Sequence, residues 1–220
     1  MKTTKQYAIL GLGRFGQKMA KELSIRDQEV IVIDRDENKV QPLKDMVSHA
    51  YIGDISDEAV LKEAGVASCD VVIIAESSNI EANILATQIC KGLDIPKVVV
   101  KSQSTLHGKI LRQIQADVIV YPEQDTAIKL ADKLTHEGML DYIEVSKECN
   151  VIEYMPPKNF VGKTLKDLEF RQKYKVAVLA IKRGDETVVS PGGDEKVEAG
   201  DIMILSGQIS DLETFGKMGD

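Results

Sequence analysis

From Gln6 to Val120, short runs of β-branched residues alternate with stretches in which apolar residues recur every three or four positions. The runs are continuously apolar, as expected of strands buried on both faces of a sheet. The intervening spacing is typical of helices with one apolar face. This alternation predicts an α/β, Rossmann-like doubly wound parallel sheet of six strands with helices on both sides. Strands are expected at 7–10, 30–33, 50–52, 71–75, 98–100 and 118–120, and helices over 15–23, 80–89 and 106–114.

The pattern changes after a further helical stretch at 128–134. Beyond Met139, strands follow one another in pairs separated by turn signals such as Pro156-Pro157 and Gly192-Gly193. We therefore expect an α/β domain at 1–136 and a second, smaller α+β domain at 137–220. Strands of the second domain are expected at 140–145, 151–155, 176–182, 186–189 and 201–206, and helices at 164–173 and 209–217.

A Gly-x-Gly-x-x-Gly motif directly follows the first expected strand and opens the first expected helix. Gly11 permits a tight turn, Gly13 lets a phosphate approach the backbone, and Gly16 lets the helix pack closely on the strand. An anion would then lie against the amides of the helix N-terminus. The predicted phosphate loop comprises Gly11, Leu12, Gly13, Arg14, Phe15 and Gly16.

Acidic residues follow three of the expected strands. Asp34 is placed to accept hydrogen bonds from ribose hydroxyls and to repel a 2′-phosphate, which disfavours NADP, although the neighbouring Arg35 argues the other way. Asp54 and Ile55 follow the third strand and Glu76 the fourth, so they should face the same crevice. Asp54 is a candidate acceptor for an adenine amino group. The alternative for these acids is a helix N-cap or a solvated loop position.

Two cations are candidates for phosphate contacts. Arg14 begins a helix at its positive end, where a cation is unfavourable unless an anion compensates it. A solvent-directed side chain is the alternative reading of Arg14. Lys101, at the end of the fifth strand, is a weaker candidate because an exposed lysine needs no explanation.

Composition excludes several classes of protein. The 28 Lys and Arg are outnumbered by 35 Asp and Glu, and the net charge of -7 opposes binding to nucleic acid. Apolar runs such as 71–75 are far shorter than the roughly 20 residues of a membrane span. Strand-like sequence begins near Gln6 and leaves no room for a secretion signal, so a cytoplasmic protein is expected.

Cys69, Cys90 and Cys149 are widely separated, and we expect them to be reduced packing residues.

Two other classes of function compete with a nucleotide sensor. A small NAD-dependent oxidoreductase would need acid and base residues beside the nucleotide, but His49, His107 and His136 lie in three different segments. An NAD-sensing transcription regulator would need a helix-turn-helix and a basic face, and the sequence indicates neither. We therefore expect a protein that is not an enzyme.

The motif GLGRFG, together with HAYIGD at 49–54 and IPKVVVKSQ at 95–103, resembles the regulator-of-potassium-conductance (RCK) family. The late segments EFRQKY, AIKRG and VVSP extend the similarity over essentially the whole chain. It is closest to the ring-forming cytosolic subunits of Ktr- and Trk-type potassium uptake systems. The resemblance implies a domain that binds ATP or ADP, or NAD or NADH in some relatives. It also implies paired subunits in a homo-oligomeric ring that acts on a membrane potassium channel.

The resemblance further implies roles for single residues in the first domain. Arg14 corresponds to the arginine that reaches a terminal phosphate. Glu123 corresponds to a glutamate beside a divalent cation, such as Mg²⁺ or Ca²⁺, at a subunit interface, and oxygen ligands suit such cations. The alternative for Glu123 is an ordinary first-turn helix charge after Pro122.

The second domain resembles a module that binds cyclic di-AMP between two subunits in some Gram-positive members of the family. This chain has Lys175 and Ala177 where relatives often have Gly and Asn, which removes a possible hydrogen bond. An ordinary dimer surface is the alternative. The candidate residues for this second ligand are Phe170, Arg171, Val176, Ala177 and Pro191.

Overall fold

Two units make up the chain in the computed structural model, which describes residues 4–135, 139–146 and 148–216. Their boundary falls between Pro122 and Glu123. The expected domain boundary at residue 136 stays a prediction. Within the described residues, no helix is both long enough and apolar enough to span a bilayer.

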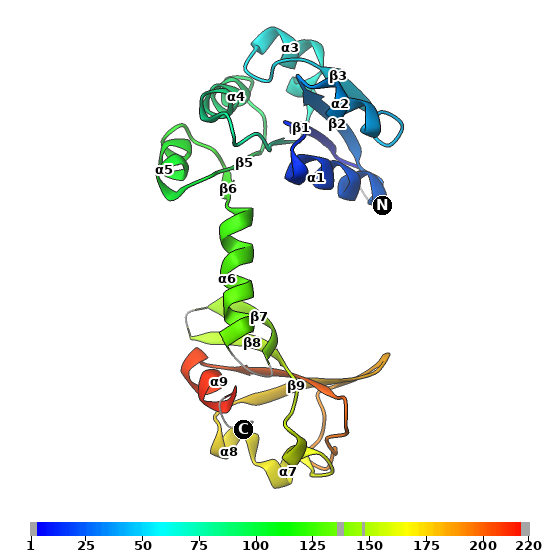
Figure 1. Ribbon diagram of the computed structural model, residues 1–220, viewed down its shortest axis with the longest axis vertical. Coiled ribbons are helices and arrows are strands. Elements are labelled where there is room, and N and C mark those ends of the chain that lie inside the picture. The colour runs from blue at the N-terminus through cyan, green and yellow to red at the C-terminus, as the bar shows by residue number, and fades with distance from the viewer. Residues whose placement is uncertain (1–3, 136–138, 147, 217–220) are drawn as a thin grey trace. The chain divides into compact units, whose positions relative to one another are not determined.

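The first unit is built on a six-stranded parallel sheet, which confirms the predicted Rossmann-like fold (Figure 1). The strand order is β3-β2-β1-β4-β5-β6, so the direction of winding reverses between β1 and β4. At such a reversal, the loops beyond the carboxyl ends of the strands diverge and leave a crevice. The strands are β1 (Gln6–Leu10), β2 (Glu29–Asp34), β3 (His49–Ile52), β4 (Val71–Ile74), β5 (Val98–Lys101) and β6 (Val118–Val120).

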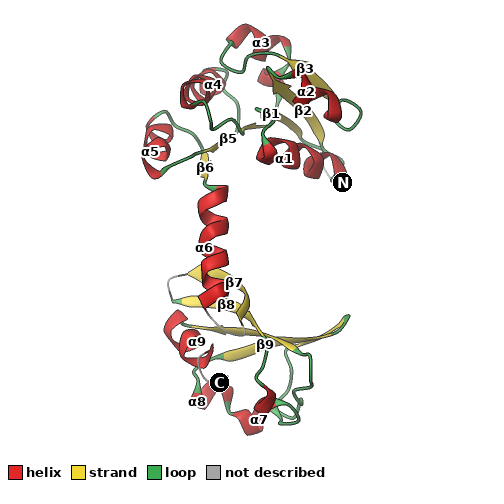
Figure 2. Ribbon diagram, in the orientation of Figure 1, coloured by secondary structure: helices red, strands yellow, loops and turns green. Residues whose placement is uncertain are grey.

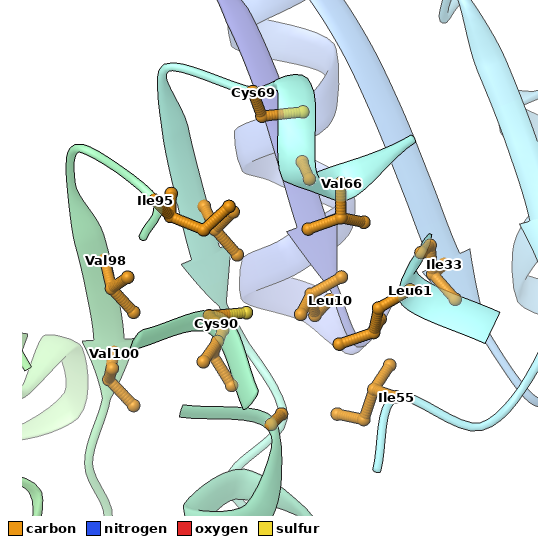
Figure 3. Packing of buried hydrophobic residues seen from close by; sticks show 14 of the residues in the cluster. Leu10, Ile33, Ile55, Leu61, Val66, Cys69, Cys90, Ile95, Val98 and Val100 are labelled. Carbon is orange, nitrogen blue, oxygen red and sulfur yellow. The ribbon is translucent and has the colours of Figure 1, made fainter. Parts of the chain in front are cut away.

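Both faces of this sheet are covered by helices, as predicted. Leu10, Ile74 and Val100 point to a cluster that includes residues of α3, α4 and α5. Figure 3 shows part of this packing, with Leu10, Val98 and Val100 among the labelled side chains. Residues of alternate positions, such as Ile9 and Ile73, pack on the opposite face with α1 and α2. The helices are α1 (Arg14–Ile25), α2 (Glu37–Val40), α3 (Glu58–Glu63), α4 (Ile80–Gly92) and α5 (Thr105–Gln113), with 3-10 turns at Gln41–Leu43 and Val66–Ser68.

The short helices α2 and α3 were not predicted. Their four and six residues are too short to display a 3.6-residue apolar period. Their starts are marked instead by aspartate N-caps. Asp36 accepts a hydrogen bond from the backbone N of Asn38, and Asp57 accepts one from that of Ala59.

The three cysteines differ in burial. Cys69 and Cys90 lie in the core between strands and helices, and burial raises the pKa of Cys69 to about 11 and that of Cys90 to about 12. They are protonated thiols at neutral pH, which confirms the predicted packing role. That prediction is wrong for Cys149, which is exposed because it starts strand β8 just after a turn.

The second unit contains a five-stranded antiparallel sheet with the strand order β10-β9-β11-β8-β7 (Figure 2). Five strands were predicted, and each is found within a few residues of its expected position. The strands are β7 (Met139–Ser146), β8 (Cys149–Tyr154), β9 (Ala177–Arg183), β10 (Glu186–Val189) and β11 (Ile202–Gly207). Helix α6 (Pro122–Thr135) begins at the last residue of the first unit. The other helices of the second unit are α7 (Leu165–Leu168), α8 (Phe170–Lys173) and α9 (Ile209–Gly216), with a 3-10 turn at Lys158–Phe160.

The single helix predicted at 164–173 is two short helices, α7 and α8. Glu169 separates them with the left-handed backbone angles φ 49° and ψ 43°, which no continuous right-handed helix contains. After this break, the side chain of Phe170 packs in an aromatic core, where its ring centroid lies 5.5 Å from that of Phe215. Phe160 and Tyr174 also contact this pair.

Lys175 offers a test of backbone strain in the second unit. Its φ is 56°, in the left-handed region that favours glycine. A side chain in this conformation costs about 1–2 kcal/mol of folded-state strain, which glycine avoids. The greater conformational entropy of glycine in the unfolded chain offsets roughly half of that gain. We expect Lys175→Gly to raise the free energy of unfolding by about 1 kcal/mol in a urea titration. Lys173→Gly, in the helix α8, should lower it by a similar amount. A loss of stability in Lys175→Gly would contradict this reading.

Candidate functional site

A cleft lies beyond the carboxyl ends of β1 to β4, where the winding of the sheet reverses. This is the position at which open parallel sheets bind ligands. The cleft brings together six of the residues expected from the sequence, namely Gly11, Asp34, Arg35, Asp54, Ile55 and Glu76. Its other lining residues are Lys39, Gly53, Ser78, Asn79 and Ala82.

The three glycines of the phosphate loop differ in what surrounds them. A Cβ on Gly16 would lie 2.0 Å from the carbonyl oxygen of Gly11, so α1 can pack on β1 only without a side chain there. A Cβ on Gly11 would lie 2.7 Å from the backbone N of Glu76, and its φ is 93°. At Gly13, no described heavy atom lies within 4 Å of the Cβ position. Gly11 and Gly16 are therefore required by the fold, whereas Gly13 leaves open space beside the helix N-terminus.

The N-terminus of α1 is electrostatically suited to an anion. Among the described residues, no side chain caps it, and its first turn contains no acidic residue. The unpaired amides and the helix dipole together favour a negative charge at this point. Arg14 begins the helix, and its exposed guanidinium makes no hydrogen bond or ion pair with the described residues. A phosphate group would satisfy both the amides and this cation.

Of the predicted loop, only Gly11 lines the cleft; Leu12, Gly13, Arg14, Phe15 and Gly16 do not. Leu12 is fully buried in the core, and Phe15 packs against the same cluster. The ammonium group of Lys101 lies 5.8 Å from the centre of the Phe15 ring, within the range of a cation-π contact. Leu12 and Phe15 anchor the loop in the core, and the backbone N–H of Leu12 donates to the carboxylate of Asp34.

Asp34 is 4% exposed and holds the phosphate loop as well as lining the cleft. Its Oδ2 accepts a hydrogen bond of 2.6 Å from the backbone N of Leu12, and its Oδ1 accepts one of 2.9 Å from that of Asp36. The Nζ of Lys39 lies 3.8 Å from Oδ2. Each carboxylate oxygen can accept about two hydrogen bonds, so Asp34 retains capacity for a ribose hydroxyl.

Two further carboxylates, those of Asp54 and Glu76, line the cleft. Hydrogen bonds from the hydroxyl and backbone N of Ser56 hold the pKa of Asp54 below its ordinary value. Burial alone would raise the pKa of Glu76, but hydrogen bonds from Ser78 and Asn79 outweigh it and leave the pKa lowered. Both groups are therefore charged at neutral pH and would repel a phosphate. The phosphates of a ligand are best placed at α1, and its adenosine near Asp34 and Asp54.

Several cleft residues were missed from the sequence. Lys39 lies on α2, which was itself not predicted, and only its position five residues after Asp34 hints at its place. Ser78 and Asn79 precede α4, and Asn79 caps that helix by accepting a hydrogen bond of 3.1 Å from the backbone N of Ala82. A run of small polar residues before a helical pattern is a capping signal that could have found them.

The histidines are dispersed. His49 starts β3 and stacks on Tyr51, with ring centroids 6.3 Å apart. His107 is buried in α5, and His136 lies outside the described residues. Neither described histidine lines the cleft.

The second unit has a hollow that includes three of the residues expected to bind a second ligand. Phe170, Arg171 and Pro191 line it, whereas Ala177 does not and Val176 is buried in the core. Further lining residues are Leu165, Lys166, Glu169, Gln172, Val178 and Gly193.

Glu123 lies in the first turn of α6. In the part of the chain that the structure describes, no group of three or more His, Cys, Asp or Glu could hold a metal ion. A cation at this glutamate stays a prediction.

Comparison with known proteins places the chain in a family. Residues 7–122 match the TrkA-N domain, and residues 151–218 match the TrkA-C domain. The chain is 43% identical to the Ktr system potassium uptake protein C of Bacillus subtilis, over 97% of this chain and 96% of that protein. It is 36% identical to the Ktr system potassium uptake protein A of the same organism, over 98% and 97% of the two chains.

The fold agrees with this assignment. The crystal structure of the GsuK RCK domain superimposes with a TM-score of 0.68 at 18% identity, over 98% of this chain and 48% of that one. Both Bacillus relatives are named as potassium uptake proteins and neither as an enzyme. The chain therefore belongs to the RCK family, with a TrkA-N and a TrkA-C domain.

Proposed function

We propose that this chain is the cytoplasmic regulatory subunit of a Ktr-type potassium transporter and that it senses adenine nucleotides in the cleft of its first unit. The observation that carries the proposal is an uncapped helix N-terminus next to a cleft lined by carboxylates. Gly13 leaves space for a phosphate, and Arg14 offers a cation beside it. Asp34 and Asp54 offer acceptors for the ribose and the adenine.

ATP and ADP are the ligands that fit this charge distribution best. A triphosphate or diphosphate would place its charge at the N-terminus of α1, beside Arg14, rather than on the carboxylate of Glu76. NAD or NADH is the second candidate, and it would have to extend its second nucleoside past this carboxylate. A divalent cation such as Mg²⁺ or Ca²⁺, held by Glu123 and the terminal phosphate of a neighbouring subunit's nucleotide, completes the proposal.

Assembly into a homo-oligomeric ring is supported by apolar side chains on the surface of the first unit. Leu106 is 70% exposed, and Ile110 beside it on α5 is 37% exposed. Ile80 and Leu85 on α4 are 41% and 44% exposed. Large apolar side chains gathered on two neighbouring helices are typical of a surface that another chain covers. A membrane potassium transporter, as in the names of the Ktr relatives, is the proposed partner of the ring.

Cyclic di-AMP is the proposed ligand of the second unit. Arg171 gives the hollow at Phe170 a cation that a phosphodiester could approach. A ligand with two identical halves suits a pair of identical hollows from two subunits.

Regulation would follow from a difference between ATP and ADP. A ligand shifts an equilibrium between two ring shapes only by its differential affinity for them. ATP and ADP differ only at the terminal phosphate. Arg14 is the cation best placed to read that difference, and it would couple the bound nucleotide to the state of the transporter.

Arg14→Ala tests this role. We expect the variant to lose about tenfold or more in ATP affinity, and clearly less in ADP affinity, because a charge-assisted hydrogen bond contributes about 1.5–3 kcal/mol. Isothermal titration calorimetry with each nucleotide gives both values. Lys18→Ala is the matched control, because Lys18 lies on the same helix but pairs with Glu22. Equal losses for ATP and ADP would remove Arg14 from the discriminating role.

A further inference from the structure

A buried polar network lies behind the cleft, in a place where the sequence indicates only packing. Asn83 is completely buried on α4, a helix that packs into the apolar core. Its Nδ2 donates hydrogen bonds to two backbone carbonyl oxygens, those of Glu76 and Lys101, the second at 3.1 Å. One amide group thus ties the loop after β4 to the end of β5.

His107 on α5 forms a hydrogen bond with the oxygen of the same side-chain amide. Its Nε2 lies 3.1 Å from the Oδ1 of Asn83, and its Nδ1 faces the backbone N–H of Gln103 at 3.5 Å. Because Nδ1 faces a donor, it must accept, and the ring proton resides on Nε2, which donates to Asn83. Burial also lowers the pKa of His107, so the imidazole stays neutral at neutral pH. The two carbonyl oxygens leave Asn83 only one amide orientation, and His107 fixes it.

The network touches the wall of the cleft through Glu76. The backbone N of Glu76 donates to the carbonyl oxygen of Leu10 at 3.2 Å, and it lies 2.7 Å from where a Cβ of Gly11 would be. The carboxylate of Glu76 accepts hydrogen bonds from Ser78 and Asn79, which line the same cleft. Any shift of the Glu76 backbone would therefore move one wall of the cleft and press on the phosphate loop.

We propose that Asn83 and His107 are positioning residues of the nucleotide site, which hold the Glu76 loop against the phosphate loop without touching the ligand. This inference rests on the proposed nucleotide binding in the cleft. It predicts that two buried residues, which do not line the cleft, control the affinity of the cleft for the nucleotide.

Thr87 shows what a purely structural polar residue looks like on the same helix. It is also completely buried, and its hydroxyl donates to the carbonyl oxygen of Asn83 at 2.7 Å, four residues earlier in α4. This bond stays within the helix and links no two elements. Thr87→Val therefore removes a buried hydrogen bond of α4 while leaving the tie between β4 and β5 in place.

The test compares ADP affinity and thermal stability in four variants of the full chain. Asn83→Leu and His107→Leu should weaken ADP binding by about tenfold or more, as measured by isothermal titration calorimetry. Thr87→Val should lower the melting temperature but change the affinity by less than about twofold. His107→Gln should bind within about threefold of wild type, because its amide N–H can still donate to Asn83.

The outcomes separate this inference from the proposed function. If wild type binds ADP and both leucine variants bind it equally well, the positioning role is wrong and the nucleotide site stands. If Thr87→Val loses as much affinity as the leucine variants, the effect is general destabilisation and the inference is again wrong. If wild type binds no ADP, the proposed function itself fails, and the inference falls with it. Should Asn83→Leu fail to fold, the contrast between His107→Gln and His107→Leu decides the question alone.

Discussion

Replacement of Gly16 by alanine is expected to abolish nucleotide binding and to destabilise the first unit by about 3 kcal/mol, the cost of severe overpacking. The added Cβ would lie 2.0 Å from the carbonyl oxygen of Gly11 and 3.1 Å from the Cβ of Ala75. Because the closest contact is with backbone, no side-chain rotation relieves it. The N-terminus of α1 would have to move away from β1, and the phosphate loop would move with it. Urea unfolding and calorimetry with ADP measure the two effects.

Gly13→Ala is the matched control, with the opposite pattern. The position has a φ of -66° and open space around it, so an alanine causes no strain and should change the stability of the chain by less than about 1 kcal/mol. Its Cβ would, however, occupy the space through which a phosphate approaches the backbone, and ADP affinity should fall about tenfold or more. Unchanged ADP binding in Gly13→Ala would place the phosphates elsewhere. A stable Gly16→Ala protein with normal affinity would contradict the described loop geometry.

Asp34→Ala is expected to have the second largest effect, on stability and on binding together. The substitution leaves the backbone N–H of the buried Leu12 without its 2.6 Å acceptor, at a cost of about 1–3 kcal/mol. The ribose acceptor disappears with it, so ATP, ADP and NAD should all lose affinity, by about 100-fold. A panel of titrations with the three nucleotides measures this loss.

Asp36→Ala controls for the local backbone around Asp34. Asp36 caps α2 but does not line the cleft, so its loss should cost about 1 kcal/mol of stability. Nucleotide affinity should stay within about twofold, because an N-cap bond confined to α2 does not reach the ligand. If Asp34→Ala binds every nucleotide as wild type does, the carboxylate serves only the loop, and the ribose assignment is wrong.

Much of the fold could be predicted from the sequence because the strands of the first unit are continuously apolar. All four residues of β4 are buried, and no exposed face interrupts its apolar pattern. The elements that escaped prediction are set by single residues rather than by periodicity. The helices α2 and α3 begin at aspartate caps, and the break at Glu169 depends on one left-handed backbone conformation.

The candidate site could be predicted as far as parallel strand order determines it. Gly11, Asp34 and Glu76 follow strands whose carboxyl ends share one edge, so they meet in one cleft. The hydrogen bond between Asn83 and His107 could not be predicted, because it joins α4 to α5 through side chains 24 positions apart. Nothing in the local pattern distinguishes these two from ordinary polar residues in helices. The placing of Glu123 beside a cation depends on a second subunit and stays a prediction.

A crystal structure of the full chain grown with saturating ADP tests the central claim most directly. The account predicts a diphosphate against the amides of α1 at Gly13 and Arg14, with the ribose hydroxyls within hydrogen-bond distance of Asp34. An empty cleft at saturating ADP would contradict it, as would a nucleotide bound at another surface.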